Sequence, residues 1–329
     1  MEELKNKDLM INENYAIRLL KRFVNQREFS VTILFILLFA ALSLTARNFF
    51  TFETLRAFML AFSIDALIAI GMVILLIGGG FDLSVGSILA LSGAVMNLFL
   101  HFNFNPFLSV FLGFLAGVLA GLINGLLVSR IGINALIATL ATMGIYRSLS
   151  LITFTSVGTK SIPEVLNKLA DFRILGLEFY VWLMFLIVIL FSIGLNKSRF
   201  LRQVYYMGGN IDSARLSGIN VKNLTLINFL ITGSLASLAG ILYVIRFRAA
   251  SVSLGTNTAL DVITAVIIGG ASLYGGRGSI KGALTGLGLM VLIQTGLVFW
   301  GVDANWQRLI VGAILILAVS IDVLTRRKK

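Results

Sequence analysis

The chain has 329 residues, of which 58% are hydrophobic and 13% are charged, and its formal net charge is +12. Water-soluble domains are about half apolar and about a quarter charged, so this composition indicates a protein that lies in lipid. The absence of cysteine and the single histidine, His101, leave no zinc ligand set and no thiol nucleophile, which argues against a metal-dependent or hydrolytic enzyme.

The first 28 residues are charged and precede a long apolar run. They do not have the pattern of a cleavable signal peptide, because no small-residue cleavage site follows a short apolar core. Apolar and basic residues alternate between Ile17 and Val24, which fits a helix on the cytoplasmic membrane surface. A disordered tail is the alternative for this cytoplasmic N-terminal segment, residues 1–28.

Ten apolar segments follow. A bilayer core about 30 Å thick needs roughly 20 apolar residues per helix. Seven segments have that length: residues 29–46, 57–77, 106–128, 179–195, 224–245, 282–300 and 307–325. Three more are shorter or interrupted: 83–100, 133–153 and 261–273. The sequence therefore predicts an all-α polytopic membrane protein with about ten transmembrane helices in a permease domain over residues 29–325.

The basic residues predict the orientation. With a cytoplasmic N-terminus, 18 of the 27 Lys and Arg residues fall on inside segments and 8 on outside segments. Membrane proteins concentrate Lys and Arg inside, so both termini are expected in the cytoplasm, including a basic tail at 326–329. The long connection 155–178 then lies outside and the long connection 196–223 lies inside. The scattered charges form no single nucleic-acid-binding face.

A glycine-rich string, GGGFDLSVGSILALSGAV, runs from Gly78 to Val95. Its glycines end one span, and Asp82 or Ser84 is placed to cap the next helix by accepting from its first free amides. Structural capping is favoured over solute contact for Asp82. Gly79 and Gly86 belong to the same motif.

In the span at 106–128, Gly113, Gly117, Gly121 and Gly125 recur every four residues and share one helix face. Such faces allow close helix packing in lipid, either within the chain or across a dimer. Asn124 lies beside this face and is placed either to line a solute pathway or to bond a neighbouring helix.

Polar groups inside spans are costly and mark pathways or internal partners. Asp65 stands near the middle of its span, where the alternatives are a position on an aqueous path and a structural pair with Arg147. Arg147 is near enough to the outer end of its span to snorkel. The candidate solute-pathway residues are Asp65, Asn124, Thr139, Thr142 and Asn228.

A second glycine-rich string, GGASLYGGRGSIKGALTG, runs from Gly269 to Gly286 and includes Gly276, Arg277 and Gly278. Four of its residues match the first string at a constant offset of 192, which indicates a possible internal repeat. No phosphate-binding loop of the form G-x-x-x-x-G-K-[ST] occurs. ATP hydrolysis by this chain is therefore not expected.

Three strings occur together in this chain: GGGFDLSVGS at 78–87, GGNIDSARLSGIN at 208–220 and IIGGASLYGGRGSIKG at 267–282. Together they resemble the permease subunit of bacterial ribose-type sugar ABC importers, a family shared with the branched-chain amino acid permeases. The resemblance implies a location in the bacterial cytoplasmic membrane and a second permease copy, identical or paralogous. It also implies a secreted or periplasmic solute-binding protein and ATPase subunits that hold ATP and Mg, with no cofactor on this chain.

The resemblance also assigns a coupling helix that seats in the ATPase. Its residues are Gly208, Gly209, Asn210, Ala214, Arg215, Ser217 and Gly218. The residues themselves agree, since Ile211–Leu216 is long enough for one short helix with Asn210 as its cap. A solvated basic loop is the alternative.

Two departures from the family pattern bear on the solute. Asp65 stands where members usually carry Asn, and Phe81 where Ile is typical. The expected solute is a pentose or hexose, with a nucleoside, a branched-chain amino acid or an autoinducer-2-type furanosyl solute as alternatives. An ion-coupled secondary carrier using Asp65 is a different class. An intramembrane hydrolase is disfavoured, because His101 lies in an outside connection.

Overall fold

The computed structural model describes residues 27–158, 161–251 and 253–327. In chain order the described helices are α2 (Arg27–Thr45), α3 (Phe52–Ile77), α4 (Val85–His101), α5 (Pro106–Leu126), the π-helix η1 (Leu127–Ile131), α6 (Ala135–Val157), α7 (Glu164–Asp171), α8 (Phe179–Lys197), α9 (Arg199–Gly209), α10 (Ile211–Leu216), α11 (Val221–Phe247), α12 (Thr258–Ile268), α13 (Ile280–Phe299) and α14 (Ala304–Arg327). A short antiparallel hairpin, β1 (Arg173–Ile174) and β2 (Leu177–Glu178), precedes α8.

The predicted helical membrane architecture is confirmed. Six helices are long and apolar enough to cross a bilayer: α3, α5 continued by η1, α6, α8, α11 and α13. Four shorter apolar helices, α2, α4, α12 and α14, coincide with the remaining predicted segments. The β-hairpin, α7, α9 and η1 were not predicted. The proposed surface helix before residue 27 and the last two residues of the basic tail lie outside the described part of the chain.

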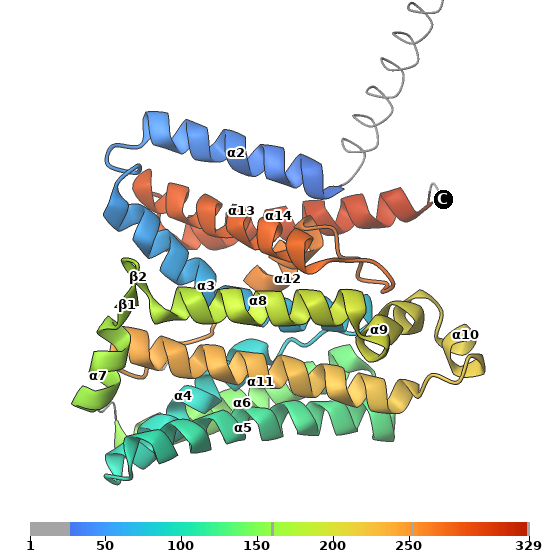
Figure 1. The fold of residues 1–329 in the computed structure, drawn as a ribbon, viewed down its shortest axis with the longest axis horizontal. Coiled ribbons are helices and arrows are strands. Elements are labelled where there is room, and N and C mark those ends of the chain that lie inside the picture. The colour runs from blue at the N-terminus through green and yellow to red at the C-terminus, as the bar shows by residue number, and fades with distance from the viewer. Residues whose placement is uncertain (1–26, 159–160, 252, 328–329) are drawn as a thin grey trace, which may run out of the picture.

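The long helices run side by side, and two irregular regions lie at opposite ends of them (Figure 1). The helices α9 and α10 form one end, which we call the elbow end. The helix α7 and the β-hairpin form the other, which we call the hairpin end. The central helices are α3 and α11, whose side chains are largely buried against α4, α5 and α13.

Short polar residues begin several of these helices. Asn105 accepts from the Phe107 amide at 2.9 Å before Pro106 opens α5, and Asn134 accepts from the Leu136 amide at 2.9 Å before α6. A side-chain oxygen at this position satisfies an amide that the helix itself leaves free. These caps stabilise the first turns of α5 and α6.

The glycine face of α5 packs within the chain, against α4 and α11. A Cβ added to Gly117 would lie 2.3 Å from the Cβ of Ser237, and one added to Gly121 would lie 2.9 Å from the Cα of Gly233. Only glycine allows such an approach of two backbones. Of the two arrangements considered for this face, packing within the chain is the one observed.

Replacing Gly117 by alanine is therefore expected to destabilise the protein by about 2 kcal/mol, because the added methyl group overpacks the α5–α11 contact. Gly144→Ala in α6 is the matched control, since a Cβ there meets nothing within 4 Å. The midpoint of thermal unfolding in detergent measures both variants. Equal midpoints for the two would contradict the packing described here.

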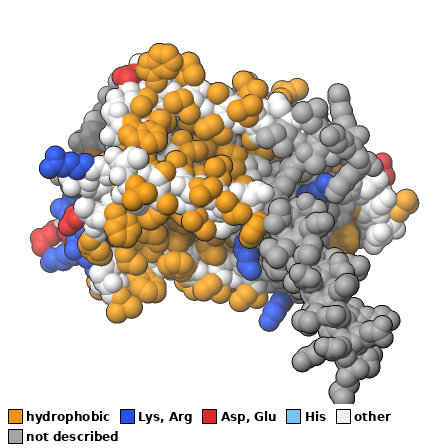
Figure 2. Space-filling model, turned by 90° about the horizontal axis from the view of Figure 1, so that it is seen from above, with side chains coloured by type: hydrophobic (Ala, Val, Ile, Leu, Met, Phe, Trp, Pro, Cys, Tyr) orange, Lys and Arg blue, Asp and Glu red, His pale blue; other side chains and the backbone are white. Residues whose placement is uncertain are grey.

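The outer faces of the helix bundle are apolar. Figure 2 shows hydrophobic side chains over most of the visible face, with charged side chains towards its edges. Leu37, Phe107, Ile137 and Leu190 each expose more than half of their surface. Exposed apolar area of this extent requires an apolar surrounding, which a lipid bilayer supplies.

Candidate functional site

The elbow segment, residues 199–218, consists of two helices separated by one extended residue. Asn210 has extended backbone angles, and its side chain accepts from the Ser213 amide at 2.9 Å to cap α10. Gly218 follows α10 with a φ of +80°, which favours glycine and turns the chain towards α11. The prediction of one short helix over Ile211–Leu216 with Asn210 as its cap is confirmed.

The outward face of the elbow segment is partly apolar. Leu216 is 90% exposed, and Tyr206 and Ile211 are also exposed. Arg215 lies beside them and makes a long contact of 3.4 Å with Asp212. Exposed apolar side chains on a small polar protrusion are typical of a protein-binding surface.

A groove of about 740 Å³ runs between α9 and α10. Arg199, Arg202, Tyr206 and Asn210 contribute to its wall, so it is basic at one side. Together the groove and the exposed residues give this end of the molecule a concave surface with charged and apolar parts.

The predicted coupling residues divide into two groups in the structure. Gly209, Asn210, Arg215, Ser217 and Gly218 are exposed, whereas Ala214 is buried and Gly208 is half-buried against the helix bundle. The motif itself did not single out Tyr206, Ile211 or Leu216. Their apolar character inside a polar loop was the one sequence signal that could have indicated a docking role. It was not sufficient, because whether such residues face inward or outward depends on packing.

Gly208 joins the elbow segment to the transmembrane helices. A Cβ at this position would lie 1.8 Å from the Ile77 carbonyl oxygen and 2.6 Å from the Gly276 amide nitrogen. The Gly276 amide itself donates to the Ile77 carbonyl at 2.8 Å. At this point the end of α9, the end of α3 and the turn before α13 therefore meet through backbone atoms.

The three glycine-rich strings of the sequence meet at this junction. Gly79, Gly275 and Gly276 have φ values of +82°, +84° and +73°, and Gly275 lies against the Cα of Gly79 and the carbonyl of Gly208. The Tyr205 hydroxyl adds a bond to the Gly278 carbonyl at 3.0 Å. We call the contacts among these glycines the glycine junction.

In the second string, the residue that caps α13 is not one of the candidate residues Gly276, Arg277 and Gly278. Ser279 caps α13 by accepting from the Gly282 amide at 2.9 Å, whereas Gly276 and Gly278 shape the preceding turn and Arg277 is exposed. Arg277 lies on the wall of a pocket of about 200 Å³ at the same end.

In the first string, Asp82 is fully buried and accepts from the Ser84 amide at 2.7 Å and the Ser84 hydroxyl at 2.6 Å. Ser84 precedes α4 but caps none of its amides with the side chain, so that predicted role is wrong. The amide that Asp82 satisfies belongs to Ser84, one residue before α4 begins. Gly86 packs against Gly255, where an added Cβ would lie 2.2 Å from a carbonyl oxygen.

Three of the candidate pathway residues join the network around Asp82. The Asn124 amide donates to Ser84 at 2.8 Å and to Asp82 at 3.2 Å, and the Tyr146 hydroxyl donates to Asn124 at 3.1 Å. Thr139 accepts from the Leu83 amide at 3.2 Å, and Thr142 donates to the Thr139 carbonyl at 3.3 Å. These buried side chains hold the turn between α3 and α4 against α5 and α6.

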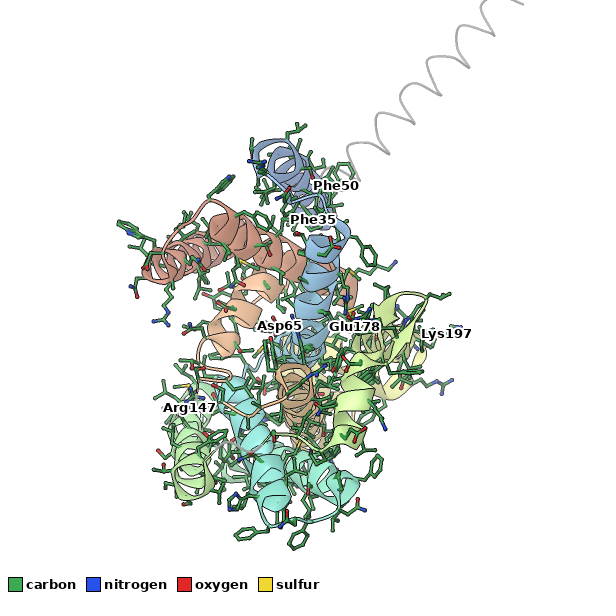
Figure 3. The ribbon with its side chains drawn as sticks, turned by 90° about the vertical axis from the view of Figure 1, so that its left-hand side faces the viewer. Phe35, Phe50, Asp65, Arg147, Glu178 and Lys197 are labelled. Atoms are coloured by element: carbon green, nitrogen blue, oxygen red, sulfur yellow. The ribbon has the colours of Figure 1, made fainter. Side chains whose placement is uncertain are left out.

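The other two candidates lie apart from that network. Asp65 accepts from the Tyr243 hydroxyl at 2.7 Å. Arg147 instead donates to the Leu254 carbonyl and the Thr256 hydroxyl, each at 2.6 Å, so the Asp65–Arg147 pair is wrong. Figure 3 shows Asp65 near the middle of the molecule and Arg147 away from it.

Asn228 is buried in α11, where its side-chain nitrogen lies over Gly78. Its side-chain oxygen has no hydrogen-bond partner in the described structure. At the hairpin end, Glu178 binds Arg56 and lies 3.7 Å from Arg173. Among the described residues, no group of three or more His, Asp or Glu side chains is arranged to hold a metal ion.

The sequence was compared with known proteins. The family described as "Branched-chain amino acid transport system / permease component" matches residues 54–319. The ribose import permease protein RbsC of Escherichia coli K12 is 34% identical over 291 residues, which is 87% of this chain and 91% of that protein.

Two further relatives carry different names. The autoinducer 2 import system permease protein LsrC of Photorhabdus luminescens is 32% identical, with 92% of each chain covered. The L-arabinose transport system permease protein AraH of E. coli K12 is also 32% identical, again with 92% of each chain covered. No solved structure matches this chain. Because the family match and these relatives cover most of its length, the chain belongs to the branched-chain amino acid transport system permease family and is a non-catalytic, multi-pass membrane component of a bacterial ABC importer.

Proposed function

We propose that this chain is the membrane-spanning subunit of an ATP-driven importer that carries a pentose or hexose across the cytoplasmic membrane by alternating access. Two permease copies, identical or paralogous, form the pathway, and a binding protein delivers the sugar from outside. ATP and Mg bind to partner ATPase subunits, and this chain binds no cofactor.

The elbow segment is the observation that carries this proposal. Its exposed residues Tyr206, Ile211 and Leu216 offer a soluble partner an apolar contact, and the glycine junction joins the same segment to α3 and to the turn before α13. A partner that moves the elbow therefore moves two transmembrane elements with it. A channel or carrier that is not driven by an ATPase would need neither an exposed docking surface on the elbow segment nor its tight junction with the transmembrane helices.

The proposal places the elbow end in the cytoplasm and the hairpin end outside. Both termini are then cytoplasmic, and ten helices cross the membrane, the four shorter apolar ones included. The excess of Lys and Arg on the connections at the elbow end supports this orientation.

The solute class is supported by the relatives, whose names give ribose, L-arabinose and autoinducer 2 as the imported solutes. These are small, neutral and rich in hydroxyl groups. Identities of 32 to 34% support this chemistry and leave the individual sugar to experiment.

The test is uptake into proteoliposomes that hold the chain with the ATPase and binding protein encoded beside it. We expect accumulation of at least one of radiolabelled ribose, arabinose, xylose, glucose and galactose, dependent on internal ATP and on the binding protein. A nucleoside and leucine are tested in the same assay, because they represent two of the alternative solutes. Uptake by the chain without the ATPase, abolished by a protonophore, would instead identify a secondary carrier that uses Asp65.

A further inference from the structure

A second cavity lies away from the elbow, at the hairpin end of the bundle. It has a volume of about 300 Å³ and lies between α12, α13 and α14. This volume is at the lower end of the range for small-molecule sites, roughly 300 to 1,000 Å³. Because α12 and α14 begin and α13 ends at the hairpin end, the cavity belongs to the outer half of the protein.

The cavity wall combines apolar side chains with several polar ones. Its polar side chains come from all three helices and the residue before α12: Asn257, Asp261, Thr264, Gln294, Gln307 and Arg308. The Gln294 side chain of α13 lies beside the Asp261 carboxylate of α12, close enough for the two to interact. Thr264 donates to the Leu260 carbonyl at 2.6 Å, which leaves its hydroxyl oxygen able to accept.

The wall carries one charge of each sign, on Asp261 and Arg308, so neither an anion nor a cation is favoured by both. A neutral polyol can bond both side chains with its hydroxyl groups. Side-chain amides add donors and acceptors to the same wall. Polar groups at membrane depth that face a cavity are characteristic of solute pathways.

The cavity also lies near a candidate pathway residue. Asp261 is close enough to Asp65 for their carboxyl groups to interact electrostatically, and Asp65 accepts from the Tyr243 hydroxyl at 2.7 Å.

We propose that the cavity between α12, α13 and α14 is a sugar-binding subsite on the outer half of the import pathway, with Asp261 and Gln294 as its recognition pair. This inference rests on the proposed function and names the place where the permease itself contacts the sugar. The carboxylate accepts from sugar hydroxyls, and the amide both donates and accepts.

Gln294→Leu tests the subsite in the assembled importer. The variant keeps the size of the side chain and removes its donors and acceptor, so we expect the rate of sugar uptake to fall about tenfold, the value of one lost hydrogen bond. Thr295→Val is the matched control on the next residue, because Thr295 bonds the carbonyl of Val291 in its own helix and does not line the cavity. An uptake rate for Gln294→Leu equal to that of Thr295→Val would overturn the proposal.

A second measurement does not depend on turnover. The chain contains no cysteine, so Gln307→Cys introduces a unique thiol on the cavity wall. In the full complex, the sugar that supports uptake should slow the modification of this thiol by a membrane-impermeant methanethiosulfonate at least threefold. Phe104→Cys, in the exposed connection between α4 and α5, should show no slowing.

The outcomes separate the two proposals. If the wild-type complex takes up no sugar of the panel, the proposed function itself is wrong. If uptake occurs but the sugar does not protect the thiol, the subsite is wrong and the proposed function stands. If the modification rate responds to phospholipid composition and not to sugar, the cavity holds a lipid headgroup and the subsite is again wrong.

Discussion

Leu216→Asp is expected to abolish ATP-driven uptake and to leave the membrane domain folded. The Leu216 side chain is 90% exposed on α10, so the substitution removes no contact within the chain. In the proposed complex this side chain is buried against the ATPase, where a leucine contributes about 1.5 to 3 kcal/mol and a carboxylate incurs a further desolvation cost. We therefore expect the affinity for the ATPase to fall at least about 100-fold.

Co-purification of the ATPase and the rate of sugar-stimulated ATP hydrolysis measure this effect. The matched control is Leu175→Asp, since Leu175 is 87% exposed on the hairpin at the opposite end of the molecule. Its φ of +52° is also tolerated better by aspartate than by leucine. If both variants retain the ATPase equally well, α10 is not the docking helix.

Gly208→Ala is expected to disconnect the elbow segment from the transmembrane helices. The added Cβ would lie 1.8 Å from the Ile77 carbonyl oxygen, so α9 must move away from the end of α3. Overpacking of this kind costs about 1 to 3 kcal/mol, and here the opposing atoms belong to backbone that cannot rotate away. Sugar uptake should fall at least about tenfold, with a lower midpoint of thermal unfolding.

The neighbouring residue provides the control. A Cβ on Gly209 meets nothing within 4 Å, so Gly209→Ala should retain uptake. Its thermal stability should rise slightly, because alanine has a better helix propensity than glycine. ATPase co-purification should persist in both variants, because neither change alters the exposed face of α10. Wild-type uptake by Gly208→Ala would show that the glycine junction does not transmit the motion.

Local signals in the sequence predicted local structure. Runs of apolar residues located the six long apolar helices and the four shorter ones of the described chain, because the required length and hydropathy follow directly from bilayer thickness. The cap at Asn210 was also predictable, since it depends on one side chain and an amide three residues away. The glycine spacing of α5 identified a packing face for the same reason.

Features that depend on tertiary neighbours were not predictable. Asp65 and Arg147 were candidates for a pair, but Asp65 bonds Tyr243 and Arg147 bonds the loop before α12. Which spans lie side by side cannot be inferred from their positions along the sequence. The outward direction of Leu216 depends on how α10 sits on α9. The meeting of three glycine strings involves residues almost 200 positions apart, such as Gly79 and Gly275.

The two bonds from Arg147 tie α6 to the loop before α12. If α6 shifted along its axis without residues 254–256, both bonds would break and the Arg147 guanidinium would lose its partners. An unpaired charge at membrane depth is costly. In the proposed transport cycle we therefore expect the end of α6 and the start of α12 to move together, by tilting rather than by a piston-like shift of α6 alone.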